Sequence, residues 1–269
     1  MLEFLFARPE LTTDIPWWQP WLGGALLNSA LLGVAHTLPK KLLTPVGHLH
    51  AWALGVILWA TLGWRAYAVM MVYFLCGSLV TRIGMAEKEA AGIAEKRSGA
   101  RGPENVWGSA ATATICALLT YFLTGKSIDH PWLSSLLLGY VASIATKLAD
   151  TSASEVGKAY GKTTYLITTL QPVPRGTEGA VSLEGSIAGI VGSLVLAIVA
   201  NILGLISGVG LVICLIAAFV ATTAESLIGA AFQDKNDWLT NELVNFINTA
   251  IGAIVAIGLG SLWQLLGTT

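Results

Sequence analysis

Charge is scarce in this sequence. Only 12% of its 269 residues are Asp, Glu, Lys or Arg, whereas 54% are hydrophobic, and the mean hydropathy is +0.68. Several apolar runs reach the roughly 18 residues or more that are needed to cross the hydrocarbon core of a bilayer. The composition therefore argues against a soluble fold. It predicts an all-α bundle that crosses the membrane several times, within a single domain that covers residues 1–269.

A concentrated basic patch is also missing, since the net charge is −1 and the pI is about 6.4. Proteins that bind nucleic acid usually carry such a patch, so we expect no nucleic-acid partner. Cysteine is rare, and Cys76, Cys116 and Cys214 each lie in an apolar run without paired spacing. That excludes a disulfide framework and a zinc motif of closely spaced cysteines. The four histidines likewise form no pattern such as HExxH.

No secretory signal is evident at the N-terminus. The segment MLEFLFARPELTTDIPWW lacks a basic start followed by an apolar core and a cleavage site of small residues. It also lacks the Arg-rich and Ser-rich composition of an organelle transit peptide. For a full-length chain, a bacterial origin is therefore the simpler expectation.

Eight apolar segments are candidates for membrane-crossing helices. Several tryptophans fall near their ends, where the amphipathic indole ring favours the headgroup region. The connection between the second and third segments is so short that the chain must reverse there in a tight turn. The segments are approximately residues 21–38, 46–62, 64–81, 106–123, 132–149, 183–205, 208–228 and 243–266.

Basic residues are almost missing from one side of the predicted bundle. With the N-terminus outside, twelve of the fifteen Lys and Arg residues fall on one side, and only Arg8, Arg65 and Lys126 fall on the other. Because cytoplasmic loops carry the excess of basic residues, both termini are predicted to lie outside. The long polar segments that then share the cytoplasmic face are residues 82–105, 147–183 and 229–242.

An internal repeat is absent as well, and few charges lie deep within a predicted span. A transporter usually places its ionisable groups near the bilayer midplane, on broken helices in related halves of the chain. Three polar segments on one face can instead converge into one site, where a water-soluble and a lipid-soluble reactant meet. An enzyme at the membrane surface is the favoured interpretation, and a small-anion transporter is the non-enzyme alternative.

The densest charge occurs in KLADTSASEVGKAYGK. Two stripes at helical spacing are Lys147, Asp150, Ser154 and Lys158, and Thr151, Glu155, Lys158 and Lys162. A helix that continues out of the fifth span would place each stripe along one face. Carboxylates among ammonium groups suit a nucleotide with Mg²⁺, which takes one or two carboxylates together with phosphate oxygens. The alternative is a set of ion pairs on the helix surface, such as Glu155 with Lys158.

A phosphate-binding P-loop is not present, although GKAYGKT is similar to one. The P-loop fingerprint needs four residues between its first glycine and the Gly-Lys pair, and it follows a strand. This segment has three, and a predicted membrane helix precedes it. Glycines that let backbone amides approach a phosphate still favour anion binding here, with Lys158 and Lys162 beside them.

Further along the chain, β-branched and aromatic residues at 165–170 predict a short strand that ends at two prolines. A loop at 175–179 then leads to Ser182, a good N-cap for the sixth span, whose helix N-terminus suits an anion. Glu184 is explained equally well by the helix dipole and by metal binding. Gly185 begins a GxxxG pair, which is more often a packing face than a site.

The first polar segment holds good helix formers and mixed charge. Residues 85–97 favour a helix that extends from the third span until glycines end it. Beyond it, Arg101, Glu104 and Asn105 form either a solvated connector or a contact to a phosphate and its metal. Arginine suits that contact because its guanidinium can bind two phosphate oxygens at once.

The third polar segment lies between the last two spans. Glu225 lies about one turn inside the seventh span, where a carboxylate is costly unless it faces protein or a polar cavity. We therefore expect either a site residue or a tether between helices. Asn241, Asn245 and Asn248 recur on one face of the last span, where amides either bridge helices or orient a phosphate.

Five separated motifs point to one family. In chain order they are GARGPENVWGS, KLADTSASEVGKAYGK, PVPRGTEGAVSLEGSIAG, AESLIGAAFQ and NELVNFINTAIGA. Together they resemble the integral membrane phytyl-phosphate kinase family (DUF92-type) of the tocopherol pathway, which is related to CTP-dependent polyprenol kinases such as dolichol kinase. The resemblance covers most of the chain, roughly from Arg82 to Gly252.

The resemblance implies phosphoryl transfer from a nucleoside triphosphate, with CTP favoured, to an isoprenyl monophosphate such as phytyl phosphate, with Mg²⁺ as cofactor. Positioning and charge neutralisation would supply most of the catalysis. The candidates for catalysis are Asp150, Lys158 and Glu184. The candidates for metal binding are Asp150, Glu155, Glu178 and Glu225. The candidates for nucleotide or phosphate binding are Lys147, Ser154, Lys162, Arg175, Thr177, Gly179, Ser182, Gly185, Arg101, Asn105, Asn241 and Asn245.

A cytidylyltransferase that makes a CDP-linked lipid is the enzymatic alternative, because it would also bind CTP and Mg²⁺ at a cytoplasmic membrane face. The two activities differ in whether a phosphoryl or a nucleotidyl group reaches the lipid product. The expected location is a bacterial inner membrane or a thylakoid membrane, with the site on the cytoplasmic face. The sequence fixes neither the length of the prenyl chain nor the oligomeric state.

Overall fold

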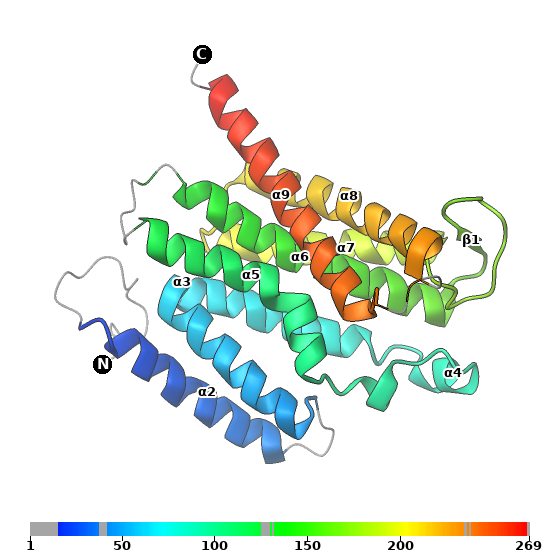
Figure 1. Ribbon diagram of the computed structural model, residues 1–269, viewed down its shortest axis with the longest axis horizontal. Helices are drawn as coiled ribbons and strands as arrows, with labels where there is room; N and C mark the ends of the chain where they lie inside the picture. Colours follow the sequence, from blue (N-terminus) through cyan, green and yellow to red (C-terminus); the bar gives the residue numbers. More distant parts are fainter. Residues whose placement is uncertain are drawn as a thin grey trace.

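The computed structural model describes residues 16–37, 42–124, 130, 132–233, 236 and 238–267. Within them the chain is mostly helical, and its long helices form a bundle (Figure 1), which confirms the predicted all-α architecture. The α-helices are α2 (Gln19–Thr37), α3 (Pro45–Val80), α4 (Met85–Ala90), α5 (Pro103–Thr124), α6 (Leu133–Tyr160), α7 (Leu183–Ile202), α8 (Gly208–Phe232) and α9 (Asn241–Gly267). The remaining elements are the 3-10 helix η1 (Lys96–Gly99) and the strands β1 (Thr164–Leu166) and β2 (Ala180–Ser182).

Some sequence predictions fall outside the described residues. The N-terminal segment is among them, as are Arg8 and Lys126 on the predicted outer side of the membrane. Residue 38 of the first predicted span, and residues 234, 235 and 237 of the third polar segment, lie outside as well. Those predictions stay predictions.

The helix α3 contains two of the eight predicted spans. Gly63 within it has φ 75° and ψ −173°, which interrupts the helix, and the two halves run in different directions (Figure 1). A positive φ costs glycine little because it has no Cβ atom. The predicted tight turn is therefore confirmed. Among the described residues, five helices are long and apolar enough to cross a membrane, namely α3, α5, α7, α8 and α9.

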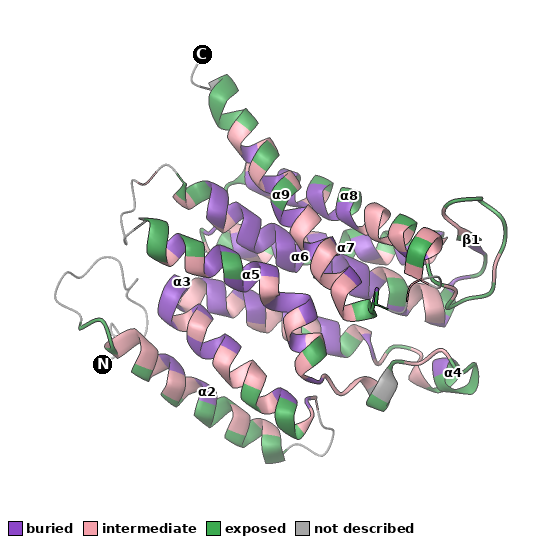
Figure 2. Ribbon diagram, viewed as in Figure 1, coloured by how far each residue is buried: buried purple, intermediate pink, exposed green. Residues whose placement is uncertain are grey.

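The helix α6 lies at the centre of the bundle. It contacts α3, α5, α7, α8 and α9, and nearly every residue from 135 to 152 is buried (Figure 2). Because other helices surround it, α6 can carry polar side chains that a helix facing lipid could not, which explains its lower hydropathy. Large apolar side chains are instead exposed on the outer helices, for example Ile187, Val191 and Phe219, as a surface that faces lipid requires.

The helix α7 packs closely along α6, because glycines on α7 place no side chain between the two backbones. A methyl group on Gly185 would lie 2.6 Å from the carbonyl oxygen of Ala153. One on Gly189, the second glycine of the pair, would lie 3.1 Å from the carbonyl oxygen of Ala149. The packing role predicted for the GxxxG pair is therefore confirmed.

The helix and the strand predicted at 85–97 and 165–170 are both shorter in the structure than the sequence predicted. The expected helix at 85–97 does not extend the third span, because α4 ends at Ala90 and is separated from α3. Gly84 and Gly92, on either side of α4, have φ of 58° and 70°, a left-handed backbone that typically ends a helix. The strand expected at 165–170 is only β1, which pairs antiparallel with β2.

Candidate functional site

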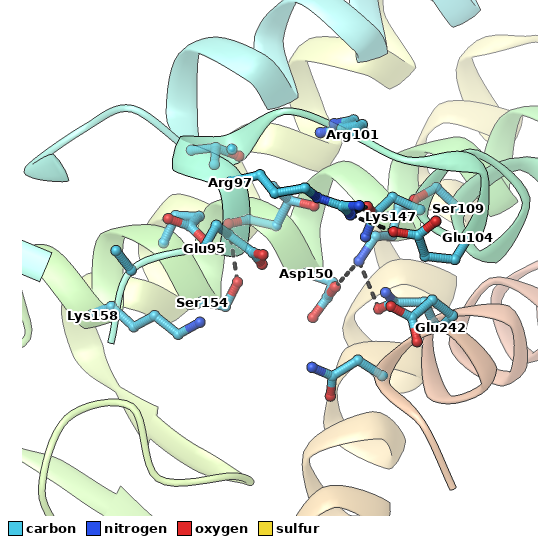
Figure 3. A pocket seen from close by; sticks show the side chains of 18 of the residues that line it. Glu95, Arg97, Arg101, Glu104, Ser109, Lys147, Asp150, Ser154, Lys158 and Glu242 are labelled. Carbon is cyan, nitrogen blue, oxygen red and sulfur yellow. Dashed lines mark hydrogen bonds and ion pairs between the residues drawn. The ribbon is translucent and has the colours of Figure 1, made fainter. Parts of the chain in front are cut away.

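The three polar segments meet at one end of the bundle, around a cavity of about 600 Å³ (Figure 3). Its walls come from the loop between α3 and α5, the C-terminal half of α6, and the adjacent ends of α8 and α9. Cavities of this size hold small-molecule ligands in many proteins. The predicted convergence is confirmed, while the membrane face on which it lies stays a prediction. The predicted site residues that line the cavity are Arg101, Asn105, Lys147, Asp150, Ser154, Glu155, Lys158, Glu178, Glu225, Asn241 and Asn245.

The cavity wall carries both signs of charge, with acidic residues in excess. Its basic residues are Arg97, Arg101, Lys147 and Lys158. Its acidic residues are Glu95, Glu104, Asp150, Glu155, Glu178, Glu225 and Glu242. Four cations against seven carboxylates leave a formal charge of −3. A polyphosphate alone would be repelled by that surplus, so the wall favours a phosphate ligand that arrives together with a divalent cation.

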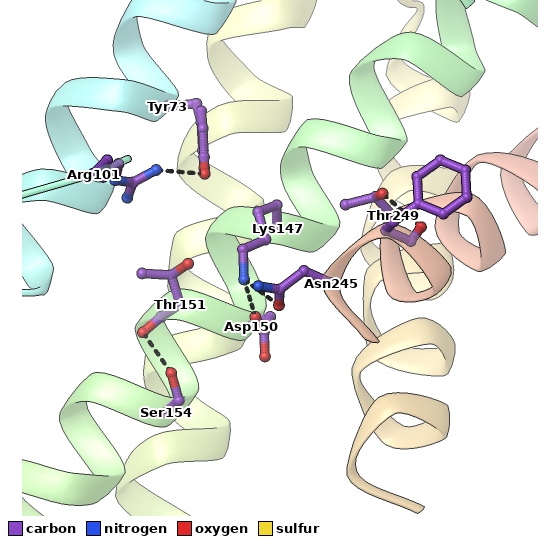
Figure 4. A network of polar contacts seen from close by, with 9 residues as sticks. Tyr73, Arg101, Lys147, Asp150, Thr151, Ser154, Asn245 and Thr249 are labelled. Carbon is purple, nitrogen blue, oxygen red and sulfur yellow. Dashed lines mark hydrogen bonds and ion pairs between the residues drawn. The ribbon is translucent and has the colours of Figure 1, made fainter. Parts of the chain in front are cut away.

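Lys147 connects α6 to α9 at the cavity wall (Figure 4). Its ammonium group donates to Asp150 Oδ2 at 2.5 Å and to Asn245 Oδ1 at 2.7 Å. The side chains of Lys147 and Asp150 are only 9% and 12% exposed, so this ion pair is largely shielded from solvent. Among the described residues no other group donates to Asp150, which leaves its second carboxylate oxygen available to a ligand.

Glu155 has a different environment. Lys88 on α4 forms an ion pair with it and also donates to the carbonyl oxygen of Thr81 at 2.8 Å. The side chains of Lys88 and Glu155 are 0% and 2% exposed, so this pair anchors the first polar segment to α6. An ion pair of Glu155 is thus present, but with Lys88 rather than with Lys158. The metal role of Glu155 stays a prediction.

Arg101 reaches the cavity from the loop before α5. Its guanidinium donates to Tyr73 Oη at 2.7 Å and lies over the rings of Tyr73 and Phe74, at 5.3 and 6.0 Å from their centroids. Its backbone N–H donates to Leu42 O, and its carbonyl oxygen accepts from Thr44 N–H, both at 3.0 Å. These contacts hold a cation in place, and the remaining guanidinium N–H groups can meet a phosphate.

Asn105 has a structural role at the start of α5. Its Oδ1 accepts from Gly102 N–H at 3.0 Å and from Arg97 at 3.1 Å, and the first of these bonds is typical of a capping side chain three residues into a helix. Arg97 also forms an ion pair with Glu104, but these side chains are 46% and 41% exposed, so the pair contributes little stability. Phosphate contacts of Asn105 and Glu104 stay predictions.

Lys158, Glu178 and Glu225 face the same cavity from α6, the loop before β2, and α8. The charges of Asp150, Lys147, Glu178 and Lys158 all act on Glu225. Glu225 therefore faces a polar cavity, as its place inside an apolar run requires. Lys158 is half-buried and has no ion pair within 4 Å among the described residues, so its ammonium group is available to phosphate oxygens.

Seven predicted site residues do not line the cavity, namely Lys162, Arg175, Thr177, Gly179, Ser182, Glu184 and Gly185. The reason is the end of α6 at Tyr160, after which the chain turns away into the β-hairpin. Lys162 lies beyond the helix and is exposed, so it does not continue the stripe on α6. Arg175 instead donates to the carbonyl oxygen of Ala159 at 2.9 Å and fastens the loop to α6.

The start of α7 has a structural role in this arrangement. Ser182 Oγ accepts from Gly185 N–H at 3.1 Å, which confirms the predicted N-cap. Thr177 donates to Pro174 O at 2.8 Å and so closes a turn of its own loop. Glu184 lies in the first turn of α7, where a carboxylate stabilises the helix dipole.

Several residues of the cavity wall were missed in the sequence. Ser109 lies inside an apolar span, so no polar segment marked it. Arg97 was counted only as a cytoplasmic charge, because the 3-10 turn that directs it into the cavity has no clear sequence signal. Glu242 was detectable, since it follows Asn241 at the start of α9.

The acidic residues do not form a metal centre by themselves. No group of three or more His, Cys, Asp or Glu side chains among the described residues is placed to hold a metal ion. Mg²⁺, however, is commonly bound by one or two carboxylates plus phosphate oxygens. Asp150 and Glu225, whose charges act on each other, fit that smaller donor set. The residues present therefore fit Mg²⁺ that enters with a polyphosphate.

Comparisons with known proteins agree with this architecture. The model of the family described as "Integral membrane protein DUF92" matches residues 28–253, a range that includes every residue of the cavity wall. The uncharacterized membrane protein sll0875 of Synechocystis sp. is 62% identical over 247 residues, which cover 92% of this chain and 94% of that protein. Protein VTE6, chloroplastic, of Arabidopsis thaliana is 46% identical over 240 residues, which cover 88% of this chain and 71% of that protein.

A more distant relative extends the comparison. The uncharacterized membrane protein MJ0933 of Methanocaldococcus jannaschii is 32% identical over 205 residues, which cover 76% of this chain and 80% of that protein. No solved structure matches this chain. The relatives are membrane proteins or a chloroplast protein by name, so the comparisons agree that this chain is an integral membrane protein with several spans.

Proposed function

Because this chain belongs to the DUF92 family of integral membrane proteins, we propose that it is an isoprenyl-phosphate kinase. It transfers the terminal phosphoryl group of a nucleoside triphosphate, with CTP favoured, to an isoprenyl monophosphate such as phytyl phosphate. The observation that carries the proposal is the cavity of about 600 Å³ in which Lys147, Lys158 and Arg101 lie beside Asp150, at the end of a bundle of membrane helices. The resemblance of the sequence motifs to phytyl-phosphate kinases supports the same activity.

The reaction needs little covalent chemistry from the protein. An oxygen of the acceptor monophosphate attacks the γ-phosphorus of the triphosphate, the bond from that phosphorus to the β–γ bridging oxygen breaks, and the nucleoside diphosphate leaves with the electron pair. The acceptor phosphate is already anionic, so no strong general base is required. The protein's task is to hold two anions close together and to offset their repulsion.

Each cavity residue has a role in that task. Lys158, which has no ion pair within 4 Å among the described residues, contacts the phosphates of the donor. Lys147, on the same helix, adds a second positive charge. Asp150, held by Lys147 at 2.5 Å, and Glu225 would hold Mg²⁺ with the donor. Mg²⁺ bound there would neutralise charge on the β- and γ-phosphates. Arg101 binds the acceptor phosphate through guanidinium N–H groups that Tyr73 leaves free.

We place the site on the cytoplasmic face, because the loops that form it carry most of the basic residues. The membrane is a bacterial inner membrane or a thylakoid membrane, and the relatives in Synechocystis and in a chloroplast support the second of these. The diphosphate product would serve the synthesis of prenyl lipids of the tocopherol or quinone type.

The test is incubation of the purified protein with Mg²⁺, phytyl or geranylgeranyl monophosphate, and CTP labelled at either the α- or the γ-phosphorus. The proposal expects γ-label in a prenyl diphosphate and release of CDP. Appearance of α-label in the lipid would instead identify a cytidylyltransferase. Anion flux into sealed vesicles without consumption of any triphosphate would identify a transporter. Both of these outcomes would overturn the proposal.

A further inference from the structure

A second, apolar cavity of about 130 Å³ lies between α2, α3 and α5. Its wall includes Leu31, Leu54, Met70, Phe74 and Val106. Leu31 is 38% exposed, so the wall of this cavity reaches the surface of the bundle. We call this cavity the tail groove.

Asn28 and Tyr67, two polar side chains of this wall, form hydrogen bonds within the protein. Tyr67 donates from Oη to Asn28 Oδ1 at 2.9 Å, and Asn28 Nδ2 donates to the carbonyl oxygen of Gly24 at 2.9 Å. Asn28 is only 5% exposed and Tyr67 only 7%. Because these polar atoms are already paired, the tail groove presents an apolar surface to an occupant.

The tail groove and the polar cavity share a boundary. Arg101, Asn105 and Ser109 line both of them. The guanidinium of Arg101 lies over Phe74, whose ring belongs to the groove, while one of its N–H groups donates to Tyr73. A ligand with an anionic head on Arg101 would therefore have its first carbon atoms at the entrance to the groove.

We infer that the tail groove binds the head-proximal part of an isoprenyl chain whose phosphate lies on Arg101. This inference rests on the proposed function. It adds where the hydrocarbon chain of the acceptor binds and how much of that chain the protein encloses. The tail groove is continuous with the polar cavity at Arg101, and this indicates its occupant. An apolar groove that opens beside a fixed cation suits an amphiphile with a phosphate head and a hydrocarbon tail. A free nucleotide has no apolar part that would enter it.

The size of the groove decides how much of the tail it holds. Sites that enclose a whole small-molecule ligand usually measure roughly 300 to 1,000 Å³, whereas this groove measures about 130 Å³. Only the isoprene units next to the phosphate are held by protein, and the rest of the chain lies in the bilayer. The enzyme therefore discriminates between substrates near the phosphate and tolerates different chain lengths beyond it.

The two cavities also assign the two substrates to opposite walls. The two cations lie apart in Figure 4: Arg101 donates to Tyr73, whereas Lys147 donates to Asp150 and Asn245. The acceptor phosphate is held on the Arg101 side. The donor triphosphate is held on the Lys147 and Lys158 side, where the carboxylates Asp150 and Glu225 lie.

The variant that tests the groove is Ala51→Phe, because Ala51 lines it from α3 and a phenyl ring there would occupy its volume. We expect the KM for prenyl monophosphates to rise by about tenfold or more, with the KM for CTP changed by less than about twofold. The matched control is Ala53→Phe on the same helix, which adds the same ring outside the groove. It should leave both constants unchanged.

Chain length gives a second measurement on the unaltered protein. Farnesyl, geranylgeranyl and phytyl monophosphates should have KM values within about threefold of one another, since they differ mainly beyond the first unit. A monophosphate with a bulky substituent on its first isoprene unit should be excluded. A KM that changes by more than tenfold with chain length would overturn the inference.

Direct binding separates this inference from the proposed function. A photoreactive prenyl monophosphate, in the absence of any nucleotide, should crosslink to Met70 or Phe74 and be displaced by geranylgeranyl monophosphate. Crosslinking there without phosphoryl transfer would reject the kinase and keep the tail groove. Phosphoryl transfer with crosslinks confined to other helices, and with normal kinetics of Ala51→Phe, would reject the tail groove and keep the kinase.

Discussion

Lys147 Nζ and Asn245 Oδ1 lie 2.7 Å apart, although the two residues are 98 positions apart in the sequence. This hydrogen bond joins the central helix α6 to α9 where both border the polar cavity. Because Lys147 also holds Asp150, the position of the Asp150 carboxylate depends on two helices rather than one. Substitutions at this junction should therefore displace the Asp150 carboxylate and impair catalysis.

Asp150→Asn tests that junction. The amide keeps the shape of the side chain but removes the negative charge, so we expect kcat/KM to fall on the order of 100-fold, as for the loss of one preorganised charged contact. Gel filtration and a melting curve in detergent should show a folded protein. The matched control is Glu87→Gln, which changes an exposed carboxylate on α4. Near-normal turnover of Asp150→Asn would remove Asp150 from the site.

Lys88→Met tests the anchor of the first polar segment. The substitution leaves Glu155 buried without its partner, and breaking a buried ion pair typically costs about 3 to 5 kcal/mol. The double variant Lys88→Met with Glu155→Leu should recover most of that stability, because no buried charge remains. Arg97→Met, which breaks an exposed pair, should cost less than about 1 kcal/mol. Equal losses at Lys88 and Arg97, measured by thermal unfolding, would contradict the anchor.

Gly77→Ala tests the position of Arg101 without changing any charge. A Cβ atom at residue 77 would lie 2.7 Å from Arg101 Nη2, so the guanidinium must move away from Tyr73. We expect the KM for the acceptor to rise by about tenfold, because small displacements of a positioning group are costly. Gly33→Ala on α2 is the control, since a Cβ there would meet no atom within 4 Å. Unchanged acceptor kinetics in Gly77→Ala would argue against Arg101 as a phosphate ligand.

Labelling of single cysteines tests the membrane orientation. In a background without the three native cysteines, Thr169→Cys lies between β1 and β2, beyond the C-terminal end of α6, and Trp132→Cys lies at the opposite end of α6. A membrane-impermeant thiol reagent should label Trp132→Cys in intact cells and Thr169→Cys only after permeabilisation. The reverse pattern would place the cavity outside the cytoplasm, where it would meet no supply of CTP.

Asn248→Leu tests a buried polar group on α9. Asn248 is 0% exposed, and neither atom of its amide group has a hydrogen-bond partner among the described residues. Burial of such a group costs about 1 to 3 kcal/mol, so the leucine variant should melt at a higher temperature with the KM for CTP unchanged. Asn245→Leu should instead melt lower, because it removes the bond to Lys147. If Asn248→Leu melted at a lower temperature than the unaltered protein, the Asn248 amide would have a hydrogen-bond partner in the folded protein, and the prediction would fail.

Periodicity and composition predicted the helices well. The apolar runs marked the positions of the long helices, although only five of the described helices are long and apolar enough to cross a membrane. The turn at Gly63 follows from the short distance between the second and third runs. The stripe from Lys147 to Lys158 was found because i, i+3, i+7, i+11 spacing defines a helix face in any context. The N-cap at Ser182 is equally local, since its partner is three residues away.

Contacts between distant segments could not be predicted in the same way. The partner of Glu155 is Lys88, which lies 67 positions earlier in the chain, whereas sequence spacing suggested Lys158. Lys162 was grouped with the site because its spacing continued a stripe on α6, and Arg175 was included through the family resemblance. The end of α6 at Tyr160 directs the chain away from the cavity, and no local pattern shows where a helix end will point.

The central place of α6 has a consequence for biogenesis. Five neighbouring helices enclose it, and it is not among the five segments apolar enough to cross a membrane by composition. A helix with Lys147 and Asp150 near its middle gains little by entering lipid alone. We therefore expect the translocon to release α6 into the bilayer only together with its neighbouring helices, so that membrane insertion of α6 and assembly of the bundle occur as one event.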